Sequence, residues 1–243
     1  MQVDALAIRL RPRTPYEAAD LGTRLCQAGA RDIYTCFAYV ALPVFAICLA
    51  TVEIATWLPV LALWWVKPWL DRTVLFVLSR AAFGQRTSIG DVWAAQRQVW
   101  WSQLFITLTW RRLSPWRSFT QPIYQLEGLS WSQIRKRVRQ IRRRRAAPAL
   151  LMTFVYNLCE TSLTLAVASF FYWFAPTVGS DSGGMLDALG LSIHPLVYPG
   201  ATALAILFLE PFYVASGFAM YLSRRAELEA WDIEQEFRRA FAQ

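Results

Sequence analysis

Two acidic residues inside long uncharged stretches are the strongest candidates for chemistry in this sequence. Glu160 interrupts the apolar stretch 149–174, and Glu210 interrupts the stretch 197–222. Since an α-helix rises about 1.5 Å per residue, both carboxyl groups would lie near the middle of a bilayer if these stretches cross it. An acid at that depth is costly unless it is paired, protonated or hydrated, so the two residues mark a site.

Three uses of this site are open. The acids can be structural, paired with a counter-charge such as Lys67 and supported by a polar neighbour such as Asn157. They can line a proton or ion pathway, or they can bind a partner helix or a lipid. Asp71 lies four residues after Lys67, so these two can also pair on one helical face.

A run of basic residues precedes the stretch 149–174. Ile134, Val138 and Ile141 repeat at helical spacing among them, which predicts a basic amphipathic helix. The run either binds anionic lipids or a partner protein, at about 1 kcal/mol per basic residue near the surface, or keeps the preceding segment cytoplasmic. We expect no nucleic-acid partner, because the run abuts a membrane span and accompanies no nucleic-acid-binding motif. The basic residues are Arg135, Lys136, Arg137, Arg139, Arg142, Arg143, Arg144 and Arg145.

Signatures of common catalytic sites are missing from the sequence. It has no GxxxxGKS/T, HExxH, GxSxG or GxGxxG motif. His194 is the one histidine, and the four cysteines form no C-x-x-C pair, so we interpret them as small buried hydrophobic residues. We therefore expect a protein that is not an enzyme and that holds neither a metal nor a cofactor.

The composition explains why so few polar groups are available. Of 243 residues, 56% are hydrophobic and 17% are charged, whereas about a quarter of a soluble domain is charged. A core that buries so much apolar surface is hard to build at this length, but a bilayer can take that surface up. The sequence therefore predicts an all-α integral membrane protein with 1–243 as a single membrane domain.

Four stretches are expected to cross the membrane as transmembrane helices. They are 33–54, 57–78 with a break at Pro68, 149–174 and 197–222. No Lys or Arg occurs from Ala146 to Ser223, and all 25 lie outside that window. Because basic residues stay on the cytoplasmic side, both termini are predicted to be cytoplasmic and 175–196 to be an outer loop.

The remaining segments are expected to form amphipathic helices on the cytoplasmic face. Residues 1–32 hold a short helix that starts at Thr14 and Pro15 and lies on the inner membrane surface. Residues 79–147 form an interfacial region rich in Trp and Arg, since ten of the 12 tryptophans lie between 57 and 131. In this region we expect a helix over 89–112, of which 99–110 is either interfacial or re-entrant, and a turn-rich loop after Pro115. Residues 223–243 form a charged helix.

Seven short fragments of the sequence form a recognisable set. They are 67–72 (KPWLDR), 79–84 (SRAAFG), 108–115 (LTWRRLSP), 117–119 (RSF), 125–129 (QLEGL), 210–213 (EPFY) and 221–234 (YLSRRAELEAWDIE). Together they resemble an uncharacterised family of proteobacterial multi-pass inner-membrane proteins, associated with gene neighbourhoods that encode MoxR-type ATPases. The resemblance covers most of 57–240. It implies a bacterial inner membrane, and therefore a periplasmic loop at 175–196, and it suggests an envelope-related assembly. It supplies no activity and no catalytic residues.

These observations leave three functional hypotheses. The first is a non-enzymatic subunit or scaffold of an envelope-associated membrane assembly, with other membrane or cytoplasmic proteins as partners. The alternative is a small proton- or ion-coupled transporter that uses Glu160 and Glu210. A third is lipid handling at the Trp-rich inner interface.

Overall fold

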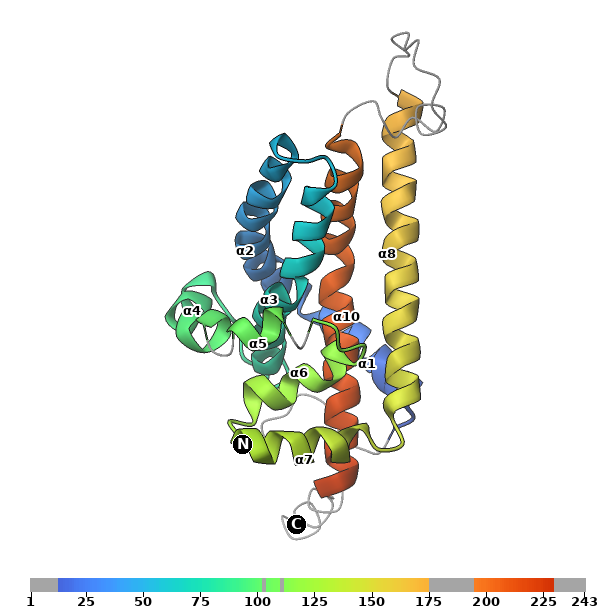
Figure 1. The fold of residues 1–243 in the computed structure, drawn as a ribbon. Coiled ribbons are helices and arrows are strands. Elements are labelled where there is room, and N and C mark those ends of the chain that lie inside the picture. Colours follow the sequence, from blue (N-terminus) through green and yellow to red (C-terminus); the bar gives the residue numbers. More distant parts are fainter. Residues whose placement is uncertain (1–12, 102–103, 110–111, 175–194, 230–243) are drawn as a thin grey trace.

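The computed structural model describes residues 13–101, 104–109, 112–174 and 195–229. Within these ranges the chain forms helices and no β-strand, so the predicted all-α class is confirmed. The four long helices run side by side, with α10 at the centre of the bundle (Figure 1). They are α2 (Ala30–Ala50), α3 (Leu58–Ala81), α8 (Ala146–Phe174) and α10 (Val197–Glu229).

Shorter helices gather at one end of this bundle, which we call the foot. The opposite end, the head, carries the turn Thr51–Glu53 that joins α2 to α3. In Figure 1, α6 and α7 cross the foot, α1 lies beside the lower half of α10, and α4 and α5 lie outside α3. These helices are α1 (Pro15–Ala28), α4 (Ile89–Ala94), α5 (Leu104–Leu108), α6 (Arg117–Leu126) and α7 (Trp131–Arg142).

Three helices of the described chain are long and apolar enough to cross a membrane. They are Ala30–Glu53, Ala146–Phe171 and Val197–Glu229, which correspond to three of the four predicted spans. The helix α3 is long enough but carries Lys67, Asp71 and Arg72 in its central part, and so falls outside this group. The structure therefore supports a membrane protein with three such helices.

The predicted break at Pro68 is wrong, because α3 is continuous from Leu58 to Ala81 with Pro68 inside it. A proline removes one backbone hydrogen bond from a helix and clashes with the preceding turn. Here Pro68 is buried, and the side chain of Gln121 donates a hydrogen bond to its carbonyl oxygen at 3.5 Å. Packing against α6 therefore supports the helix at the position where the sequence predicts an interruption.

The helix α1 packs against α10 instead of lying free on a surface. Thr14 caps it by accepting a hydrogen bond from the Glu17 amide at 3.3 Å, as the Thr-Pro start predicts. Its buried side consists of Ala18, Gly22 and Cys26. A β-carbon on Gly22 would collide with the backbone of α10 at Ala215, so the two helices cross in direct backbone contact.

A second close crossing lies two residues further along α10. A β-carbon on Gly217 would come within 2.5 Å of Ser118 in α6. The small residues 215–217 therefore let α1 and α6 approach α10 in the same short band of the helix. Small residues are enriched where helices pack closely, since they let the backbones approach.

The region 84–131 differs from its prediction in two places. Instead of one helix over 89–112, the chain forms α4, a π-helical turn at Arg97–Trp101 and the short helix α5. Instead of a turn-rich loop after Pro115, it forms α6, which contains Pro122 and is mostly buried against α10 and α3. The prolines misled the sequence interpretation, because burial of this segment outweighs the local cost of Pro122.

The segment that includes 99–109 is fastened to α3 by polar contacts. Arg72 of α3 donates hydrogen bonds to the Gln98 carbonyl at 2.9 Å and to the Thr107 hydroxyl at 3.3 Å. The indole of Trp100 donates to the Thr73 hydroxyl at 3.0 Å. Buried polar groups of α3 therefore hydrogen-bond to this segment. Part of the tryptophan-rich region thus packs within the protein.

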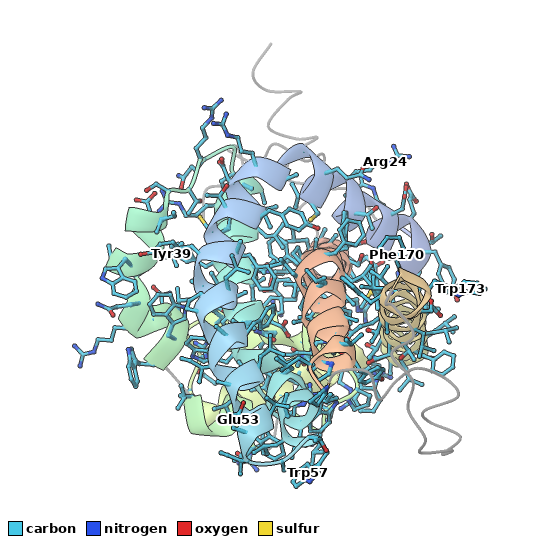
Figure 2. The ribbon with its side chains drawn as sticks, turned by 90° about the horizontal axis from the view of Figure 1, so that it is seen from above. Arg24, Tyr39, Glu53, Trp57, Phe170 and Trp173 are labelled. Atoms are coloured by element: carbon cyan, nitrogen blue, oxygen red, sulfur yellow. The ribbon has the colours of Figure 1, made fainter. Side chains whose placement is uncertain are left out.

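The helices α8 and α10 differ in how they are packed. The helix α10 contacts α1, α2, α3, α6, α7 and α8, and it continues without interruption from the predicted fourth span into the predicted tail as far as Glu229. The helix α8 stands at the edge of the bundle, and its main contact is α10 (Figure 1). Viewed down the bundle, Phe170 and Trp173 point away from the other helices (Figure 2). Most of the predicted loop 175–196 and tail residues 230–243 lie outside the described residues.

Candidate functional site

The predicted polar site exists, and Lys67 is its centre. The Lys67 ammonium nitrogen lies 2.5 Å from Oε2 of Glu160 and 2.8 Å from Oε2 of Glu210. One lysine on α3 therefore joins α8 and α10. Both acids of the sequence prediction and their expected counter-charge meet at one point.

Arg117, at the start of α6, completes the group. Its Nε lies 2.8 Å from Oδ2 of Asp71, and its Nη2 donates a hydrogen bond to Oε1 of Glu210 at 2.9 Å. Glu210 thus contacts one base with each carboxylate oxygen. We call Lys67, Asp71, Arg117, Glu160 and Glu210 the charged cluster; it links α3, α6, α8 and α10.

Four of the five side chains of the charged cluster are buried, and that of Glu160 is partly exposed, at 19%. The exposed fraction is 0% for Asp71, 1% for Glu210 and 6% for Lys67. Burial alone would lower the pKa of the Arg117 guanidinium, but Asp71, Tyr213 and Glu210 around it raise that pKa above its ordinary value. Removing one partner of such a buried pair costs about 3–5 kcal/mol, because it leaves a charge without compensation.

Two details of the sequence prediction are wrong. Lys67 does not pair with Asp71 of its own helix. Its ammonium group binds Glu160 and Glu210, and Asp71 binds Arg117 instead. Asn157 lies on the wall beside the cluster, but its amide donates to the Thr153 carbonyl at 2.7 Å within α8. The amide therefore supports its own helix and does not hydrogen-bond the acids.

Sequence reasoning missed Arg117, which was assigned to a loop. A signal was present in the spacing of Arg117, Gln121 and Gln125, which places three polar residues on one helical face. All three are buried, and Gln125 donates to the Arg72 carbonyl at 2.9 Å. Polar residues at this spacing between apolar ones therefore indicated a buried helix whose polar face hydrogen-bonds to a neighbouring helix.

A cavity of about 310 Å³ adjoins the charged cluster. Its walls come from α3, α8, α10, the start of α6 and the segment that precedes it, and they include Lys67, Glu160, Glu210 and Arg117. Arg112 also lines it, with its guanidinium carbon 3.5 Å from the ring centre of Trp64. Burial lowers the pKa of Arg112 to about 10, so this guanidinium is still charged at neutral pH.

The basic run is divided between two sides of α7 and the turn that follows it. Arg137 pairs with Glu127 and Glu229, Arg145 pairs with Glu227, and Arg142 stacks 3.6 Å from the ring centre of Trp116. Ile134 and Ile141 of the predicted apolar stripe are buried on that same inner side. The outer side carries the exposed bases Arg135, Lys136, Arg139, Arg143 and Arg144.

Metal-binding groups do not converge in the part of the chain that the structure describes, where no three His, Cys, Asp or Glu side chains could hold an ion together. Cys26, Cys36 and Cys48 are buried, as expected of small hydrophobic residues, whereas Cys159 is exposed on α8. Burial raises the pKa of the Cys26 thiol to about 12.

Comparison with known proteins adds no relative. No model of a protein family matches the sequence, and neither a curated protein nor a solved structure matches it. The function of the protein is therefore inferred from the geometry of this chain.

Proposed function

We propose that this protein is a non-enzymatic subunit or scaffold of a bacterial inner-membrane assembly. The observation that carries the proposal is the internal pairing of the charged cluster: Glu160, Glu210 and Asp71 each have a basic partner within 2.9 Å. Charges that are paired with each other inside the protein hold its helices together. Recognition of other molecules is then left to the surfaces.

The topology that we propose has four membrane crossings with both termini cytoplasmic. The helix α3 has 24 residues, about 36 Å at 1.5 Å per residue, which exceeds the hydrocarbon thickness of about 30 Å. It returns beside α2 toward the foot, and its central charges contact other parts of the protein. A polar span of this kind is tolerated where its charges face the bundle interior. The foot would then lie on the cytoplasmic side, where the basic run belongs.

The foot supplies the surface for partners. Five exposed bases on the outer side of α7 and the following turn suit the anionic headgroups of the inner leaflet or an acidic partner protein. The remaining three bases of the run contact acids or an aromatic ring within the protein. The run therefore has one side that stabilises the fold and one side that is available for recognition.

Isolation from native membranes tests the subunit proposal. The tagged chain, expressed at its natural level, is crosslinked, extracted in mild detergent and analysed by mass spectrometry. We expect a stoichiometric protein partner that is lost in the triple variant Arg139→Gln, Arg143→Gln, Arg144→Gln and kept in the exposed control Arg24→Gln. A chain that is recovered alone, even after crosslinking, contradicts the proposal.

The cavity beside Lys67 favours a second candidate, a proton- or ion-coupled transporter. The cluster holds three acids and two bases, and the cavity contacts Glu160 and Glu210. Flux assays in liposomes test this candidate with the double variant Glu160→Gln, Glu210→Gln, using Glu53→Gln in the exposed head turn as the control. Flux that only the cluster variant abolishes supports transport, whereas equal flux in all three proteins excludes these acids as the pathway.

A further inference from the structure

Arg112 is a buried base that has no direct carboxylate partner in the described part of the protein. Its guanidinium is 8% exposed, and it forms neither a hydrogen bond nor an ion pair with the residues that the structure describes. Its one contact of note is the face of the Trp64 ring. A guanidinium stacked on an aromatic ring keeps its N–H groups free in the plane, where they can donate to a ligand.

The charges around the cavity balance, because the bases Lys67, Arg112 and Arg117 face the acids Asp71, Glu160 and Glu210. The contacts are shared unequally. Lys67 binds Glu160 and Glu210, and Arg117 binds Asp71 and Glu210. Arg112 is therefore the one base of this group, among the described residues, that touches no carboxylate.

The start of α6 adds donors to the same place. Arg117 and the preceding Ser114 and Pro115 line the cavity, and no side chain caps the first turn of α6, a helix of 10 residues. Uncapped N–H groups and the positive end of the helix dipole favour an anion. Two independent features, a buried free guanidinium and an uncapped helix start, thus meet at one cavity.

We propose that this cavity binds a phosphoryl group, which the edge of Arg112 and the start of α6 hold. The planar fork of an arginine matches the oxygens of a phosphate in two parallel hydrogen bonds. The hydroxyl of Ser114 and the second amide N–H of Asn157 on the walls suit the remaining oxygens. Leu113, which is 76% exposed, and Trp64 give the cavity an apolar border. The phosphoryl group can belong to a phospholipid headgroup or to free phosphate. The proposal does not depend on the subunit function above.

The test uses the full chain purified in detergent, with two probes and three variants. Inorganic phosphate is titrated while the melting temperature is recorded. In a separate arm, native mass spectrometry measures retention of phosphatidylglycerol against a phosphate-free galactolipid. Arg112→Gln removes the charge, and Asn157→Phe fills the cavity but keeps the charge. Arg24→Gln, an exposed arginine on α1 that pairs with Asp20, is the matched control.

We expect saturable binding in the natural chain and in Arg24→Gln, and affinity at least tenfold lower in Arg112→Gln and in Asn157→Phe. Binding of inorganic phosphate alone assigns the phosphoryl group to free phosphate, and retention of phosphatidylglycerol alone assigns it to a lipid headgroup. Binding of both probes shows that the cavity accepts either. Absence of both responses, or equal affinity in Asn157→Phe and the natural chain, overturns the proposal. If Arg112→Gln fails to fold, Asn157→Phe decides alone.

Discussion

Gly217 of α10 and Ser118 of α6 lie so close that a single added β-carbon would reach within 2.5 Å of the serine side chain. A β-carbon on Gly22 of α1 would likewise collide with the backbone of α10 at Ala215. Two helices of the foot therefore depend on the absence of side chains in one narrow band of α10. This dependence leads to the first prediction.

Gly217→Ala should lower the melting temperature of the detergent-solubilised protein, because the added methyl group forces α6 away from α10. Overpacking of this kind costs about 1–3 kcal/mol. Gly200→Ala on the same helix is the control, since nothing lies within 4 Å of a β-carbon there. We expect the control to melt at or above the temperature of the natural protein. A Gly217→Ala protein as stable as the control would show that the crossing is looser than described.

Lys67→Met should destabilise the protein by about 3–5 kcal/mol, because two buried carboxylates lose their shared base. The double variant Lys67→Met, Glu160→Gln should recover part of that loss, since one of the stranded charges is removed as well. Denaturant unfolding in mixed micelles measures both values. Additive losses in the double variant would show that the 2.5 Å pair contributes no coupling energy.

Cys26 of α1 should resist alkylation in the folded protein. N-ethylmaleimide is expected to spare it, because it is buried and its thiol pKa is raised to about 12. Because the thiolate is the reactive form, raising the pH from neutral to about 9 should still leave Cys26 unmodified in the folded protein. Peptide mass mapping reads out each site, and modification in denaturant provides the positive control. Rapid modification of Cys26 under native conditions would contradict its burial against α10.

Reporter fusions test the four-crossing topology. Fusions at Gln85, Ser182 and Gln243 should report inside, outside and inside, because α3 brings the chain back toward the foot before residue 85. A Gln85 fusion that reports outside would mean that α3 does not cross the membrane. The basic run would then need another explanation.

Local patterns in the sequence were sufficient for the main elements. The Thr14 cap, the apolar stripe with Ile134 and Ile141, and the three long apolar stretches all have a short-range physical cause that one sequence displays. The two acids within long apolar stretches also stood out, because charge inside such a stretch is rare.

Partners distant in the chain could not be predicted in the same way. Arg117 and Glu210 are 93 positions apart, and no local pattern connects them. Lys67 was a candidate partner both for the two acids and, by the helical i,i+4 rule, for Asp71, and the sequence did not decide between these pairings. Pro122 suggested a turn because the rule for proline describes an isolated helix, whereas α6 is buried between α3 and α10. Where packing supplies the stability, local preference is a weak guide.

The central position of α10 has a consequence for biosynthesis. It is the last helix of the described chain to leave the ribosome, yet α1, α2, α3, α6, α7 and α8 all pack against it. Until it arrives, Lys67 and Arg117 lack Glu210, and Gly22 and Ser118 face no partner backbone. The emerging chain must therefore wait in a partly assembled state, and a product that terminates after α8 would be a substrate for membrane quality control.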